Sequence, residues 1–319
     1  MRRNLGLFVA IVALGFAASP VLAAGPPSAA LGGVALGVIP PLAQAAGLAR
    51  PSGGSSSNLS YHGGPVMLTN TTYAIFWGPS NSWDSGYQTL IDRFFGDVQA
   101  DNGKSTNVYA SDTQYYNAAT TKIAYNSTVG GFRLDTNAYP ASGCTDQATA
   151  ICLTDTQLQA EIKADISAAG WSAGPSKLFL IFTPKGVGSC LGSSCAYTTF
   201  CAYHNWFTSG GSPVLYANQP YGAAGYSVYT CDAGQRPNGN TADATINLLS
   251  HEHNEAITDG QGTAWFDRRG YENGDKCAWN FGSSQGTSGA RYNQTINTHR
   301  YYLQQEWSNA RSGCVLTGQ

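Results

Sequence analysis

The residues best suited to chemistry lie in the segment Ile246–Asp259, which contains His251, Glu252 and Glu255. The spacing of apolar residues predicts a helix over Thr241–Thr258, with this histidine and both glutamates on one face. His251 and Glu255 stand four residues apart, one helical turn, so both side chains can bind the same cation. The segment therefore predicts a metal site on one helix face.

The pattern His-Glu-x-x-Glu differs from the zincin motif His-Glu-x-x-His at one ligand position. In zincins the first and last residues of the motif bind zinc, and the intervening glutamate takes a proton from metal-bound water. Glu252 is therefore the predicted general base. A third ligand must come from elsewhere, and the downstream acidic segment Tyr271–Cys277 can fold back. The predicted zinc ligands are His251, Glu255 and Glu272, with Asp275 as an alternative ligand or as support.

Two other interpretations of this acidic segment stay open. The first is a solvated helix face without a metal, because surface helices commonly carry Glu and Asp. The second is a structural calcium site, which His251 argues against, since calcium prefers oxygen ligands. The calcium ligands would be Glu255, Asp259, Glu272 and Asp275.

The other histidines have simpler predicted roles. His253 falls on the apolar side of the helix, which predicts a buried structural histidine. His204 lies in an aromatic segment and is expected in the core or at a sheet edge. His62 belongs to a Gly-Gly turn.

The composition excludes several classes of protein. Of 319 residues, 42% are hydrophobic, 12% aromatic and 11% charged. The 17 basic residues nearly balance the 19 acidic ones, so the chain has no basic footprint for nucleic acid. Such a density of aromatic residues also excludes a disordered chain. The low charge is typical of secreted proteins.

The N-terminus predicts export. Arg2 and Arg3 precede the apolar stretch Leu5–Ala18, and the small residues before Ala23 fit a signal-peptidase site. Residues 1–23 are therefore a predicted signal peptide, and we expect a secreted protein that has no membrane association after cleavage.

The eight cysteines predict disulfides rather than metal ligands, because their number is even and the chain is exported. Proximity favours Cys144–Cys152 and Cys190–Cys195. The remaining four are assigned as Cys201–Cys231 and Cys277–Cys314 only because they are left over.

The chain reads as one α/β (α+β) domain after a leader. Residues 24–60 are low in complexity and read as a leader or propeptide, and residues 61–319 form the folded domain. A loop-rich part beyond Gly260 is expected to depend on disulfides. Besides the helix already named, helices are predicted at Ser85–Ala100 and Thr154–Ala169. Strands are predicted at Tyr73–Trp77, Val108–Ala110, Leu178–Phe182, Cys201–Trp206 and Val214–Ala217.

The order of several short motifs resembles the plant EXORDIUM family, also called phosphate-induced proteins. The resemblance implies an extracellular or wall-associated protein linked to growth responses, with no settled biochemical activity. The His-Glu-x-x-Glu helix would make this chain a bacterial-type relative. The shared motifs are Tyr61-His-Gly-Gly-Pro-Val66, Phe76-Trp77, Ile246-Asn-Leu248, Thr258-Asp259, Tyr292-Asn293, Arg300-Tyr-Tyr-Leu303 and Cys314-Val-Leu316.

These observations lead to two functional hypotheses. The first is a secreted metal-dependent hydrolase, a zincin-type zinc peptidase with a zincin-like fold, acting on extracellular protein or peptide. The second is a non-catalytic extracellular EXORDIUM-like binding or signalling module with a structural metal, which contacts cell-wall polysaccharide or a receptor. The expected cofactor is Zn²⁺, with Ca²⁺ as the alternative.

Overall fold

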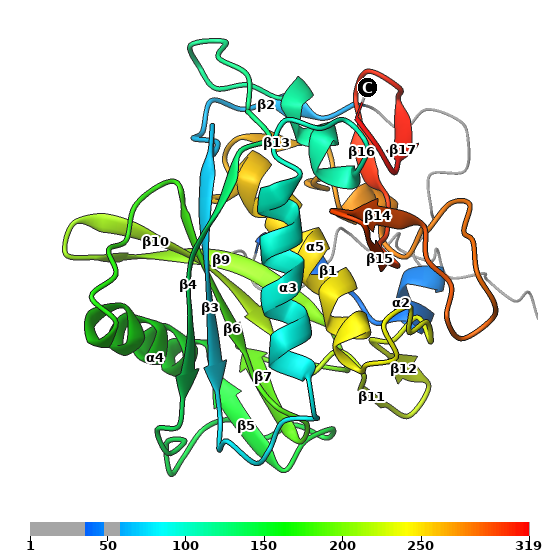
Figure 1. Cartoon of the computed structure of the whole chain (residues 1–319). Coiled ribbons are helices and arrows are strands. Elements are labelled where there is room, and N and C mark those ends of the chain that lie inside the picture. The colour runs from blue at the N-terminus through cyan, green and yellow to red at the C-terminus, as the bar shows by residue number, and fades with distance from the viewer. Residues whose placement is uncertain (1–35, 48–57, 319) are drawn as a thin grey trace, which may run out of the picture.

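The main feature of the structure, a computed structural model that describes residues 36–47 and 58–318, is a six-stranded mixed sheet (Figure 1). β10, β6, β3 and β4 are parallel neighbours, whereas β9 is antiparallel to β10 and β1 is antiparallel to β9. The expected α/β class is confirmed. In sheet order, the strands are β1 (Leu36–Ile39), β9 (Ala202–Ser209), β10 (Ser212–Gln219), β6 (Lys177–Phe182), β3 (Asn70–Trp77) and β4 (Ser127–Asp135).

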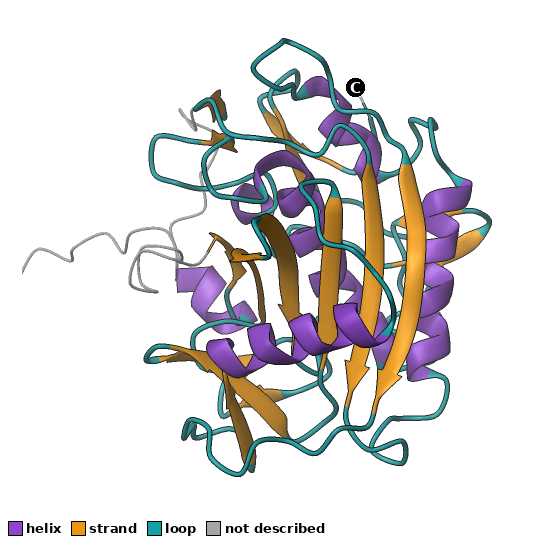
Figure 2. Cartoon of the chain, turned by 90° about the vertical axis from the view of Figure 1, so that its left-hand side faces the viewer, coloured by secondary structure: helices purple, strands orange, loops and turns teal. Residues whose placement is uncertain are grey.

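The sheet is covered on both faces. α3 (Tyr87–Ala100) and α5 (Ala242–Asp259) lie on one face, and α4 (Asp155–Ala168) crosses the other, as Figure 2 shows. Alternate residues of β6 serve the two cores: Leu180 packs with the α3 and α5 side, and Ile181 with the α4 side. A strand buried on both faces reads as a continuous apolar run, so the sequence prediction of a strand there is confirmed.

The predicted helices are present with ends shifted by one or two residues. α4 begins with the expected capping box, in which Thr154 accepts from the Gln157 N–H and the Gln157 side chain accepts from the Thr154 N–H. The predicted strand at Val108–Ala110 is wrong. These residues begin the 3₁₀ helix η1 (Val108–Gln114), because the Asn107 side chain accepts from the Tyr109 N–H and caps a helical turn.

α5 is the central helix of the molecule. All 18 of its residues are buried, so a solvated acidic face is wrong for this helix. β1, β9 and β10 pack against one side, and α3 and η1 against another. The polar face and the apolar face that the sequence predicts for this helix are therefore both inside the protein. One faces a buried polar region and the other faces the apolar core.

Short strands and loops complete the domain. The only further helices among the described residues are α2 (Leu42–Gly47) and the 3₁₀ turn η2 (Asp275–Cys277). The small sheets pair β5 (Ile151–Thr154), β7 (Val187–Leu191) and β8 (Ser194–Cys195); β2 (Ser60–Tyr61) and β13 (Trp265–Phe266); β11 (Gly225–Tyr226) and β12 (Tyr229–Thr230); β14 (Gln294–Ile296) and β15 (His299–Tyr301); and β16 (Glu306–Ser308) and β17 (Gly313–Val315).

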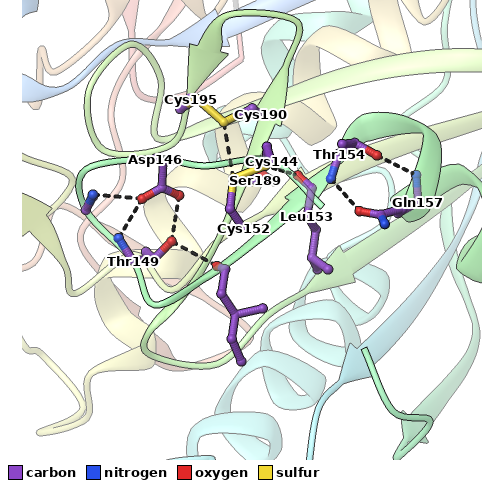
Figure 3. The surroundings of a disulfide bond; sticks show 12 residues. Cys144, Asp146, Thr149, Cys152, Leu153, Thr154, Gln157, Ser189, Cys190 and Cys195 are labelled. Atoms are coloured by element: carbon purple, nitrogen blue, oxygen red, sulfur yellow. Dashed lines mark hydrogen bonds between the residues drawn. A yellow bond between two sulfur atoms is a disulfide. The ribbon is translucent and has the colours of Figure 1, made fainter. Parts of the chain in front are cut away.

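All eight cysteines form disulfides, in the four pairs expected. Figure 3 shows the two disulfides of the β5–β7–β8 sheet, Cys144–Cys152 and Cys190–Cys195. The sulfurs of Cys152 and Cys190 lie 3.3 Å apart. Because each sulfur is already bonded to another partner, this approach is a packing contact and no thiolate is present to bind metal. The loop-rich C-terminal part is held by Cys277–Cys314.

The N-terminal part of the described chain differs from the expected domain start at residue 61. Residues 36–39, inside the predicted leader, form an edge strand of the main sheet. The predicted signal peptide, residues 1–23, lies outside the described residues. Within the described ranges, no helix combines the length and apolar character needed to cross a bilayer.

Candidate metal centre

A buried cluster of histidines and carboxylates lies between α5 and β9. His251, Glu252 and Glu255 come from α5, His204 comes from β9, and Glu272 comes from the segment between β13 and η2. The first four are 0% exposed. Their donor atoms form two groups that share Glu255, and the atoms of each group lie within 4.8 Å of one another. The groups are His204, Glu255 and Glu272, and His251, Glu252 and Glu255.

The first group brings a strand and a loop to the helix. The Nε2 of His204 lies 3.0 Å from Glu272 Oε2 and 3.7 Å from Glu255 Oε2. Tetrahedral zinc with bonds of about 2.0 to 2.2 Å separates its ligand atoms by about 3.4 Å. The two distances from His204 Nε2 lie on either side of this value, and all three atoms are within 4.8 Å of one another, as ligands of one small cation could be.

The second group follows from the helical spacing. The Nε2 of His251 lies 3.2 Å from Glu255 Oε2 and 4.0 Å from Glu252 Oε1. Asp275 Oδ1 is 3.9 Å from the same nitrogen. Of the predicted ligands, the structure thus places Glu255 and Asp275 beside His251, whereas Glu272 lies with His204.

The segment Glu272–Asp275 folds back onto α5, as expected for a downstream acidic segment. The Asp275 N–H donates to Glu255 Oε1 at 2.7 Å, which leaves Glu255 Oε2 directed toward the histidines. Gly274 permits this approach, because a Cβ there would lie 2.8 Å from His251 Nδ1 and 2.9 Å from Glu255 Oε1. Any larger residue would push the loop away from the helix.

Gln304 fixes the ring of His251. Its Nε2 lies 2.7 Å from His251 Nδ1 and also donates to the Gly274 carbonyl, while its Oε1 accepts from the Trp279 N–H. These backbone partners orient the amide so that it donates to Nδ1, and the proton of the neutral ring then sits on Nε2. Cation binding through Nε2 would require the ring proton to be on Nδ1 instead, with the Gln304 amide rotated so that its Oε1 accepts from Nδ1–H.

Burial dominates the electrostatics of the cluster. It raises the pKa of Glu252, Glu255 and Glu272 well above the usual range, and neighbouring carboxylates raise the pKa of Glu252 and Glu272 further. Burial likewise lowers the pKa of His204 to about 3 and that of His251 to about 4. Without a cation the histidines are therefore neutral at pH 7, and the carboxyl groups bind protons more tightly than usual, in competition with a metal ion.

Three residues of this region were not predicted from the sequence. His204 was expected in the core or at an edge, and its position in β9 does bury it, but against Glu255 and Glu272. Glu306 is 0% exposed with neither oxygen hydrogen-bonded, and Asp112 Oδ2 is also unpartnered. No spacing signal links these residues to α5, because each is 38 or more positions from the nearest residue of that helix.

The remaining histidines and Asp259 lie outside the cluster or are engaged in other contacts. His253 is buried between the Tyr109 hydroxyl at 3.1 Å and Asn70 Oδ1 at 3.0 Å, the structural role expected for it. His62 is exposed and stacks on Phe266. Asp259 Oδ1 accepts from the N–H groups of Thr263 and Ala264, so it shapes the turn after α5.

Comparisons with known proteins provide no relative for this chain. No family model matches it, and no curated protein or solved structure is significantly similar. The resemblance to the EXORDIUM proteins therefore rests on the short sequence motifs alone, and the function has to be argued from the geometry of the cluster.

Proposed function

We propose that this protein is a secreted hydrolase that uses one divalent transition-metal ion, zinc, bound at Glu255. The supporting observation is the convergence of buried polar atoms without a hydrogen-bond partner. Among them are Glu255 Oε2, Glu272 Oε1 and both oxygens of Glu252. Leaving such groups unpaired in the interior costs about 1 to 3 kcal/mol each. A cation at this point would satisfy several of them together.

The donor set favours zinc over calcium. Calcium takes six to eight oxygen ligands, whereas imidazole nitrogen suits zinc and its neighbours among the transition metals. His204, Glu255 and Glu272 would hold the ion, since their atoms have the closest mutual spacing, and His251 would be the further donor across Glu255. Asp275 would support Glu255 through its backbone N–H.

The metal ion and the residues around it would have separate roles in hydrolysis. The metal, when bound, would polarise a water molecule or a carbonyl oxygen. Glu252 would accept the proton of the attacking water and return it to the leaving amine. The peptide bond is the proposed target because Glu252 follows His251 as the general base does in zincins.

The extracellular setting is part of the same proposal. The four disulfides favour an oxidising compartment, and the N-terminal sequence favours export. Membership of the EXORDIUM family is included on the strength of the shared motifs.

A second candidate function is a non-catalytic extracellular module with a structural metal. Full burial of the cluster favours it, because a catalytic site must admit its substrate. The polysaccharide contact that this alternative needs would use the aromatic residues elsewhere on the chain.

The Glu252→Gln variant separates the two functions. We expect it to keep its fold and its metal, and to lose about 100-fold or more in hydrolysis of unfolded casein. The assay is run with and without chelator, and before and after limited proteolysis, because the cluster is closed in the intact chain. Full activity of the variant would contradict the role of Glu252. Absence of any chelator-sensitive hydrolysis, with binding to insoluble glycan, would favour the module.

A further inference from the structure

The strand β1 lies directly over the metal centre. It pairs antiparallel with the edge of β9, with Leu36 opposite His204 and Val38 opposite Tyr203, and it packs on α5 (Figure 1). Val38 and Ile39 are 0% exposed. Because β9 is otherwise the last strand on this side of the sheet, β1 occupies the place that any further strand would take.

Gly37 makes the closest approach. A Cβ on this residue would lie 1.8 Å from Glu255 Oε2 and 2.5 Å from His204 Nε2, so only glycine fits here. These are atoms of two proposed metal ligands. The backbone N–H groups of Val38 and Ile39 also face the carboxyl groups of Asp275 and Glu252. The main chain of β1 thus contacts the residues proposed to do the chemistry.

The contacts that hold β1 are those of a bound peptide. The Cys201 N–H donates to the Ile39 carbonyl at 2.7 Å, and Trp279 Nε1–H donates to the Pro40 carbonyl at 2.7 Å. Residues 36–47 contain no cysteine, so no disulfide ties them to the domain. Their covalent link to the domain that follows is the Gly/Ser-rich stretch 48–57.

We propose that residues 36–41 are an internal peptide ligand that closes the metal centre until the chain is cut between this segment and residue 58. The cut is hydrolysis of one peptide bond by a protease, with one water consumed. Release of β1 then exposes the edge of β9 to an extended polypeptide substrate, which would pair with it by strand addition. The side chains of Val38 and Ile39 are buried in the core, and the residue between Leu36 and Val38 must have no side chain because it lies against Glu255. The effect of this closure on hydrolysis rests on the proposed function, whereas the binding of residues 36–41 over the cluster does not.

The experiment uses the full secreted chain with a specific protease sequence in place of Ser52–Ser57. After cutting, native gel filtration with mass spectrometry follows the fragment that contains residues 36–47. A fluorescent peptide of residues 34–47 then reports rebinding. We expect the fragment to exchange with this peptide, and a Gly37→Val peptide to bind at least about tenfold more weakly because of the clash with Glu255. The matched control is Gln44→Ala, an exposed position in the same segment, which should bind like the unaltered peptide.

Three results would overturn the proposal. The fragment could stay in place without exchange, the cut chain could unfold when the fragment leaves, or the Gly37→Val peptide could bind as well as the original. The first two would make β1 a permanent strand of the fold. Because peptide binding requires neither metal nor turnover, these outcomes are separate from failure of the hydrolase hypothesis, which the Glu252→Gln assay detects.

Discussion

Glu255 is the residue on which the cluster depends. Its two oxygens have different environments: Oε1 accepts from the Asp275 N–H, and Oε2 faces His204 and His251. A carboxylate held at one oxygen is oriented at the other, which is how supporting hydrogen bonds prepare a metal ligand. His253, two residues after His251, has an equally buried ring but only neutral partners, so it provides a natural comparison within the same helix.

The first prediction concerns His253. The His253→Ala variant should lose about 3 kcal/mol of unfolding free energy, because it removes two hydrogen bonds and leaves a cavity in the core. Its metal content should be unchanged. Urea unfolding of chelator-treated protein measures the first effect and elemental analysis the second. Loss of metal without loss of stability would show that His253 belongs to the metal site.

At the residue scale, the sequence predicted which residues lie together when they are close in the chain. His251, Glu252 and Glu255 share a helix, so their spacing alone places them together. His204 could not be found in this way, because its position depends on β9 pairing with β10 and packing on α5. The same holds for Glu306 and Asp112, which lie in β16 and η1 and reach this region only through the fold.

At the scale of the elements, the sequence pattern did not reveal that α5 is buried on every side. Apolar periodicity identified α5 correctly, but a helix with one polar face is ordinarily a surface helix. Here the polar face meets β9, β1 and the Glu272–Asp275 loop. The edge strand β1 was also not predicted, since Leu36–Ile39 is a short apolar run within a low-complexity leader.

The end of β4 and the facing side of α4 give a prediction about pH. Asp135, Glu161 and Asp165 lie together there, and burial, followed by the effect of Asp135, raises the pKa of Glu161 to about 7. The folded chain therefore binds the Glu161 proton more tightly than the unfolded chain does. Stability from this proton is complete below about pH 4.5 and declines as the pH rises to about 7.

Glu161→Gln should remove that part of the decline. The melting temperature of the variant relative to the unaltered chain should rise between pH 4.5 and pH 7, in buffer with chelator. Gln keeps an acceptor for the Asn137 side chain, so the hydrogen bond is preserved. A constant difference across this range would mean that Glu161 titrates normally.

On the scale of the whole molecule, two of the disulfides differ in the segments that they connect. Cys277–Cys314 spans 37 residues and joins η2, beside Asp275, to the C-terminal strand β17. Cys144–Cys152 spans 8 residues and ends in β5, which contacts α4. The two bridges have similar chemistry, but of the two only the first is next to the candidate metal centre.

Removal of each bridge by a Cys→Ser pair should therefore have different effects. Loss of Cys277–Cys314 should cost about 4 kcal/mol, and loss of Cys144–Cys152 about 2 to 3 kcal/mol, because the longer loop gains more chain entropy on unfolding. Only the first pair should also weaken metal binding. Equal metal affinity in both variants, measured by competition with a chelator, would mean that the η2 loop holds its position without the bridge.

The metal content of the purified chain tests the central claim most directly. Elemental mass spectrometry is applied to the unaltered protein, to Glu255→Gln and to the matched His253→Ala control. We predict about one zinc ion per chain, lost in Glu255→Gln and retained in His253→Ala. An unaltered chain that binds no zinc when zinc is supplied, or a Glu255→Gln variant that binds it equally well, would contradict a metal centre at this cluster.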